Sequence, residues 1–135
     1  MKVFVDTNVL IDYLCKREPF FVPAKTIFAL CYMGKIEIVM SSLSIVNTLY
    51  IGRKHDSSKL KQSLLRLSHI VSFMDLTTSI VLNTLQTEWS DYEDALQYAT
   101  AQASESDCII TRNKCDYNLS TLPVYTPEEL LAMQN

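Results

Sequence analysis

Three aspartates lie where an α/β protein could bring them together: Asp6, Asp94 and Asp116. Asp6 directly follows a short apolar run near the N-terminus, and Asp116 lies in the loop after a second apolar run. Asp94 falls in the first turn of an expected helix that leads into that second run. Because ligands of open α/β sheets bind beyond the carboxyl ends of the strands, we expect these three carboxylates at one edge of a sheet.

Carboxylates held this close together repel one another, and their burial is costly unless a cation lies between them. Mg²⁺ and Mn²⁺ are hard ions that prefer oxygen ligands and usually retain several water molecules. Such an ion would relieve the repulsion, activate water and stabilise negative charge on a phosphodiester. The three aspartates are therefore candidate metal ligands and catalytic residues.

Each acidic residue also has a structural alternative. Asp6 is equally suited to cap a following helix, whereas Asp94 shares a helix face with Tyr98 and should point toward the protein. Asp91 and Glu93 are expected to cap that helix or to interact with its dipole. Three further aspartates are expected in turns, in caps or on the surface: Asp12, Asp75 and Asp107.

The elements that must position these residues are predicted from the apolar patterns. Short apolar runs predict strands over residues 2–5, 36–40, 70–73, 108–111 and 124–125. Apolar residues at helical spacing predict helices over residues 8–15, 24–31, 45–50, 80–85 and 95–102.

Polar residues at the ends of these segments predict where helices begin. Ser90 with Glu93, and Thr126 with Glu129, have the spacing of capping boxes that would open the last two helices. An additional helix is expected to begin at Asp56 or Ser57, and its apolar side would consist of four leucines: Leu60, Leu64, Leu65 and Leu67.

Strands separated by helices predict an α/β protein whose central, mainly parallel sheet of four or five strands is flanked by helices. No linker or repeat divides the chain, so residues 1–135 are expected to form one domain. The four cysteines form no CxxC pair, which disfavours a zinc site. The N-terminal segment has the pattern of neither a secretory signal nor a membrane span, so we expect a cytoplasmic protein without a membrane partner.

Two segments resemble the PIN domain family. The segment VDTNVLID, residues 5–12, is similar to the family's first motif, whose metal-binding aspartate corresponds to Asp6, beside Thr7 and Asn8. The segment DYEDALQYATAQASESDCIITRNKCDY, residues 91–117, is similar to the family's second half, with Asp94 as its third acidic position and Asp116 in the stretch that carries the fourth. The resemblance implies a three-layer α/β/α fold and a metal-dependent ribonuclease, often the toxin of a bacterial toxin–antitoxin pair.

Two positions depart from the family's pattern. Asn47 stands where the family usually has glutamate, and Asn113 stands where many members have aspartate. An asparagine offers a carbonyl oxygen but no negative charge, so the metal is expected to bind more weakly.

We therefore predict an endoribonuclease that uses Mg²⁺ or Mn²⁺ to cleave single-stranded RNA. Five residues are expected to position water or phosphate: Thr7, Asn8, Asn47, Thr111 and Asn113. Because the net charge is −3, contacts with RNA would need local basic residues, whose structural alternative is a solvated helix face: Arg53, Lys54, Arg112 and Lys114. A cognate antitoxin and a second copy of the chain are the expected protein partners.

Two other functions stay open. A PIN-fold module that has lost turnover, and that binds nucleic acid or a protein partner, is favoured by the neutral residue at position 47. A phosphatase-like or receiver-like domain would also place an aspartate after its first strand, but position 8 is asparagine rather than a second aspartate. The three aspartates in matching positions favour the enzyme.

Overall fold

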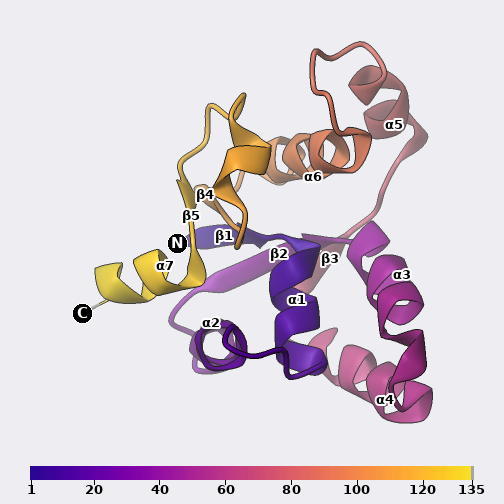
Figure 1. Ribbon diagram of the computed structural model, residues 1–135. Helices are drawn as coiled ribbons and strands as arrows, with labels where there is room; N and C mark the ends of the chain where they lie inside the picture. The colour runs from indigo at the N-terminus through magenta and orange to yellow at the C-terminus, as the bar shows by residue number, and fades with distance from the viewer. Residues whose placement is uncertain (135) are drawn as a thin grey trace.

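The computed structural model describes residues 1–134 and is built around a five-stranded parallel sheet with the strand order β3–β2–β1–β4–β5 (Figure 1). The strands are β1 (Lys2–Val5), β2 (Glu37–Ser41), β3 (Ser72–Met74), β4 (Cys108–Ile110) and β5 (Val124–Tyr125). Central strand β1 pairs in parallel with both β2 and β4. The predicted parallel sheet is confirmed.

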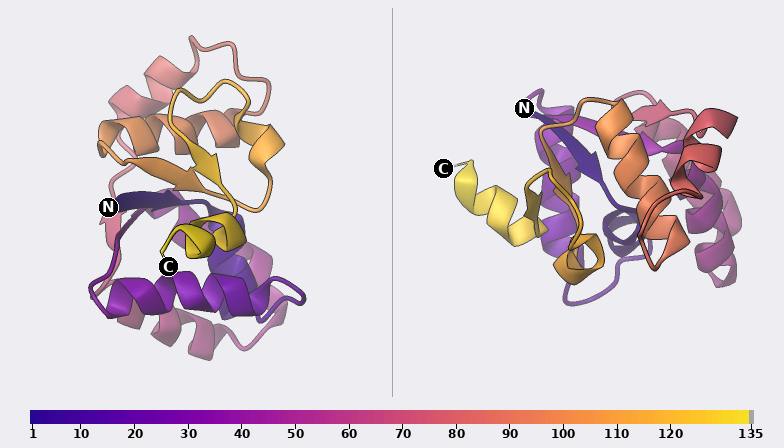
Figure 2. Two further views of the ribbon diagram at one scale, coloured as in Figure 1. Left: turned by 90° about the vertical axis from the view of Figure 1, so that its left-hand side faces the viewer. Right: turned by 90° about the horizontal axis from the view of Figure 1, so that it is seen from above.

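Helices cover both faces of this sheet, which gives the expected three-layer α/β/α architecture (Figure 2). The helices are α1 (Thr7–Leu14), α2 (Phe21–Tyr32), α3 (Ser42–Ile51), α4 (Ser57–Leu67), α5 (Thr78–Thr84), α6 (Tyr92–Ala103) and α7 (Pro127–Met133). Two short 3₁₀ helices are η1 (Gly52–Lys54) and η2 (Lys114–Tyr117). Helices α5 and α6 lie on one side of the sheet, and α1, α2, α4 and α7 lie on the other.

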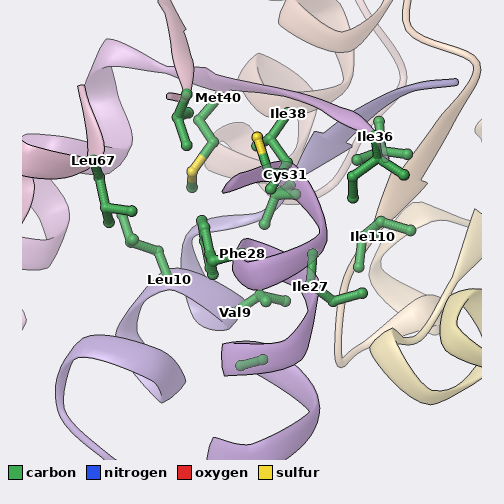
Figure 3. Packing of buried hydrophobic residues seen from close by; sticks show 14 of the residues in the cluster. Val9, Leu10, Ile27, Phe28, Cys31, Ile36, Ile38, Met40, Leu67 and Ile110 are labelled. Carbon is green, nitrogen blue, oxygen red and sulfur yellow. The ribbon is translucent and has the colours of Figure 1, made fainter. Parts of the chain in front are cut away.

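Successive side chains of a strand point to opposite faces of the sheet, so the core consists of one cluster on each face. Val3 and Val5 point into the larger cluster with α1, α2 and α4, whereas Phe4 points into the smaller cluster with α6. Figure 3 shows side chains of the larger cluster, among them Leu10, Phe28 and Met40, packed between the helices and the sheet. Burial of such side chains contributes about 1.5–3 kcal/mol each, so the apolar runs fix the position of β1 and the residue that follows it.

The starts of α4 and α7 agree with the sequence prediction. Asp56 caps α4, and Thr126 forms the predicted capping box with Glu129 at the start of α7. For α6, the predicted capping role of Asp91 is confirmed and the capping box at Ser90 was wrong, because the Asp91 side chain accepts a hydrogen bond from the Asp94 backbone N–H at 3.0 Å. Glu93 is therefore not part of a capping box.

Two further sequence predictions were wrong in detail. Leu65 is 68% exposed, because a helix turns by about 100° per residue and the buried face of α4 consists of Leu60, Leu64 and Leu67. The third strand begins at Ser72 rather than at residue 70, since its pairing with β2 joins Ser72 to Val39. None of the helices within residues 1–134 has the length and apolar composition needed to cross a membrane.

Candidate active site

Asp6 lies at the carboxyl end of central strand β1 and is also the N-cap of α1. Its Oδ1 accepts a hydrogen bond from the Thr7 backbone N–H at 2.7 Å, and its Oδ2 accepts one from the Thr111 hydroxyl at 2.9 Å. Only 6% of Asp6 is exposed, and no basic side chain within residues 1–134 forms an ion pair with it. Asp6 thus caps a helix and is also a buried carboxylate without a cationic partner.

Buried polar side chains of α3 and α6 form hydrogen bonds beside Asp6. Gln97, on α6, donates from Nε2 to the Thr7 hydroxyl at 2.9 Å and to Asp6 Oδ1 at 3.3 Å. The Thr7 hydroxyl also lies 2.6 Å from the hydroxyl of Ser44, on α3. Gln97 was missed in the sequence. Gln97 follows Asp94 by three positions on α6, and residues at this spacing lie on the same face of a helix. This spacing was the signal that could have identified Gln97.

The three predicted aspartates line one pocket of about 290 Å³ at this edge of the sheet. Asp94 projects from the first turn of α6 and is half-buried, whereas Asp116 lies on η2 and is exposed. Asp91 and Glu93, at the start of α6, line the same pocket. The pocket thus collects acidic side chains from β1, α6 and η2, which are far apart in the sequence.

Burial and mutual repulsion disfavour the charged forms of these carboxylates. Desolvation raises the pKa of Asp94 to about 7, and the neighbouring charges of Asp91, Asp116, Asp6 and Glu93 add to the rise. Desolvation also raises the pKa of Asp6, although its hydrogen bonds with Thr111 and Thr7 oppose the rise. A positive charge in the pocket would favour ionisation of both groups.

Of the polar residues predicted beside the aspartates, Asn8 and Thr111 lie against Asp6, as Thr7 does. The Asn8 amide donates to Asp6 Oδ2 at 3.4 Å and to the Thr111 hydroxyl at 3.3 Å. Asn113 is exposed, and its backbone N–H donates to the Thr111 hydroxyl at 3.2 Å. The Asn113 side chain is absent from the pocket lining, so its predicted contact with water or phosphate stays a prediction.

Asn47 faces this region from α3. Its Nδ2 donates a hydrogen bond of 2.8 Å to Glu93 Oε1, which joins α3 to the first turn of α6. Desolvation raises the pKa of Glu93, and the charges of Asp6 and Asp91 raise it further. The sequence analysis assigned Glu93 to capping or to the helix dipole. Its hydrogen bond with Asn47 was missed, because that bond depends on how two helices far apart in the sequence pack together.

Among the predicted RNA-contacting residues, Arg112 alone lines the pocket. Its Nε donates to Asp12 Oδ2 at 2.8 Å, and its guanidinium lies 4.2 Å from the centre of the Phe20 ring. Asp12, expected on the surface or in a cap, is in fact only 2% exposed, because Arg112 and Arg17 both pair with it. Arg17, which also lines the pocket, was missed in the sequence.

The other predicted basic residues lie outside the pocket lining. Lys114 pairs with Glu129 at 3.1 Å, on the side of α7. The Arg53 guanidinium donates to the Tyr50 backbone carbonyl at 2.7 Å and stacks on the Tyr50 ring. Lys54, the next residue of η1, is exposed. Contacts of these residues with RNA stay predictions.

The donors of the pocket fit a hard divalent ion. They are carboxylate, amide and hydroxyl oxygens, and the buried Asp6 carboxylate has no cation beside it within residues 1–134. The Tyr117 hydroxyl, buried near Asp6, makes no well-formed hydrogen bond. Among residues 1–134, no three acidic, histidine or cysteine side chains are already gathered at ligand distance, so bound water or side-chain movement would complete the coordination.

This strand order, with an aspartate at the end of the central strand, agrees with the resemblance to the PIN domain family that the sequence predicted. The family model of the PIN domain matches residues 2–115, so the chain belongs to the PIN domain family.

Individual relatives extend this similarity over nearly the whole chain. The chain is 25% identical over 139 aligned positions to "Ribonuclease VapC1" of Aquifex aeolicus, covering 99% of this chain and 96% of that protein. It is 26% identical, with a TM-score of 0.68, to a chain of a toxin–antitoxin complex from Klebsiella pneumoniae, covering 93% of this chain and 97% of that one. Its fold also matches VapBC2 of Rickettsia felis, solved bound to a promoter DNA fragment, with a TM-score of 0.68 and 16% identity over 92% of this chain and 97% of that one.

Proposed function

We propose that this chain is a metal-dependent endoribonuclease that cleaves single-stranded RNA in the cytoplasm and acts as the toxin of a toxin–antitoxin pair. The observation that carries the proposal is that the buried Asp6, which forms no ion pair within residues 1–134, lines one pocket with Asp94 and Asp116. The similarity to a ribonuclease and to a toxin–antitoxin protein supports the reaction class and the biological role.

The chain's own residues would prepare the pocket for phosphodiester hydrolysis. Asp6, Asp94 and Asp116 would hold Mg²⁺ or Mn²⁺, which when bound activates water and neutralises charge on the phosphodiester. Gln97 and Thr111 fix the Asp6 carboxylate by hydrogen bonds, so its orientation is set before any ligand enters. Arg17 and Arg112 at the pocket wall would attract an RNA phosphate, although Asp12 holds both guanidinium groups.

A second cavity supports a protein partner. A groove of about 580 Å³ lies among α1, α2 and α4 and is lined by Tyr13, Leu14, Phe28, Tyr32, Leu67 and Ile70. Lys25, Arg66 and His69 also line it. An apolar antitoxin segment that carries acidic residues would fit this groove. Exposed apolar side chains on α2 and α3, such as Tyr32 and Tyr50, offer further surface for an antitoxin or a second copy of the chain.

Cleavage of a fluorescent, unstructured RNA tests the enzymatic proposal. We expect slow cleavage with Mn²⁺ or Mg²⁺, none with EDTA, and a loss of about 100-fold or more in Asp6→Asn and Asp94→Asn. Asp75→Asn, which removes an exposed charge outside the pocket, is the control that should cleave like wild type. Cleavage that persists in EDTA or in Asp6→Asn would contradict the proposal.

The alternative is a non-catalytic PIN module, which the neutral Asn47 and the exposed Asn113 favour. It predicts that the folded protein binds RNA or an antitoxin but leaves every RNA intact at saturating Mn²⁺.

A further inference from the structure

We propose that Glu93 is a fourth carboxylate of the metal site and that Asn47 is the residue that positions it. The proposal rests on the proposed metal-dependent function. It assigns a metal-binding role to a residue that sequence analysis placed in helix capping, and a positioning role to a residue without charge.

The first support is geometric. Glu93 and Asn47 are 46 positions apart, yet Asn47 Nδ2 lies 2.8 Å from Glu93 Oε1. The bond occupies one carboxylate oxygen and restrains the side chain in the pocket that Asp6, Asp94 and Asp116 also line. An asparagine amide is suited to this task, because it donates a hydrogen bond to a carboxylate without adding charge to an already acidic pocket.

The second support is that Glu93 is not needed to cap α6, although it lies in the first turn of that helix. The N-cap of α6 is Asp91, whose side chain accepts from the Asp94 N–H, so the start of the helix is capped without Glu93. Glu93 forms no ion pair within residues 1–134. A hydrogen bond at an exposed position adds little to folding stability. A stabilising link between α3 and α6 therefore does not explain why Asn47 and Glu93 are paired.

The third support comes from two buried residues that contact Asp6. Gln97 lies four positions beyond Glu93 on α6 and is completely buried, and its Oε1 has no hydrogen-bond partner. The buried Tyr117 hydroxyl near Asp6 also lacks a well-formed hydrogen bond. These unpartnered polar atoms lie on residues that contact Asp6, which lines the same pocket as Glu93. A hydrated cation held by Asp6 would bring water molecules close to them.

The test is the dissociation constant of Mn²⁺, measured by calorimetry and by the electron paramagnetic resonance signal of free Mn²⁺, without RNA. We expect Glu93→Gln to weaken Mn²⁺ binding about 10-fold or more, and Asn47→Ala to weaken it by a smaller factor. The double variant Asn47→Glu with Glu93→Gln moves the carboxylate to the other helix and keeps an amide opposite it. It should recover affinity to within about threefold of wild type.

Glu88→Gln is the matched control, because Glu88 is an exposed carboxylate five positions away that does not line this pocket. If it weakens Mn²⁺ binding as much as Glu93→Gln, the effect is general electrostatics and the proposal is overturned. Unchanged Mn²⁺ affinity in Glu93→Gln overturns it as well, while loss of binding in Asp6→Asn would leave the proposed function standing. If wild type binds no Mn²⁺, the proposed function and this inference fail together. Circular dichroism in EDTA shows that each variant is folded.

Discussion

At the scale of single residues, the site combines a rigid carboxylate with a titratable one. Asp6 is held by neutral donors on two sides, whereas Asp94 lies among acidic neighbours at the start of α6. No side chain within residues 1–134 forms an ion pair with either carboxylate, so folding without metal must occur against the repulsion between them.

The raised pKa of Asp94 predicts how the stability of the protein depends on pH. Its pKa in the folded chain is raised from 3.8 to about 7, so its contribution to stability is intact below about pH 4 and is lost as the pH rises through 7. In EDTA, the melting temperature of wild type should fall by several degrees between about pH 5 and pH 8. Asp94→Asn should flatten this profile, and an equally steep fall in that variant would assign the dependence to other groups.

Asp12 makes a prediction for stability alone. It is buried between Arg112 and Arg17, and its removal would leave two cationic side chains without their partner. We expect Asp12→Asn to lower the free energy of unfolding by roughly 2–3 kcal/mol, less than for a fully buried pair because Arg112 and Arg17 are partly exposed. Urea denaturation measures the loss, with Asp75→Asn as the exposed control. Equal stability of the two variants would show that the pair is unimportant.

At the scale of elements, the start of α6 determines where Asp94 and Glu93 lie. Asp91 satisfies the Asp94 backbone N–H, which anchors the first turn beside β1 and α3. Asp91→Ala should therefore cost about 1 kcal/mol of stability, whereas Asp91→Asn should restore most of it because asparagine also caps helices well. If Asp91→Asn and Asp91→Ala are equally destabilised in thermal melts at high salt, the charge rather than the cap is what matters.

The positions of helices and strands could be predicted where the spacing of apolar residues agreed with the capping residues at the ends of the segment. Where these two signals did not agree, the predictions were less accurate. β1, β2 and the capping box of α7 follow directly from local residues. The topological rule for parallel sheets was enough to bring Asp6, Asp94 and Asp116 to one pocket. The roles of Asp12, Gln97 and Glu93 were missed, because each depends on a partner at least 46 positions away that only tertiary packing supplies.

At the scale of the whole molecule, the acidic pocket and the apolar groove lie on different parts of the fold. The pocket is at the carboxyl edge of the sheet and is lined by residues of α1, α3, α6 and η2, whereas the groove is lined by residues of α1, α2 and α4. Figure 1 shows where these helices lie around the sheet. Helix α1 contributes residues to both, Asn8 to the pocket and Tyr13 to the groove. A partner that fills the groove would therefore contact the helix that Asp6 caps.

The central claim, that this pocket holds a divalent metal, is tested most directly by crystals soaked in Mn²⁺ and measured for anomalous scattering. We predict an anomalous peak within ligand distance of Asp6 and of Asp94 or Asp116, and its disappearance in crystals of Asp6→Asn. A wild-type crystal with no peak in the pocket at saturating Mn²⁺, or with its peaks only at other sites, would contradict it.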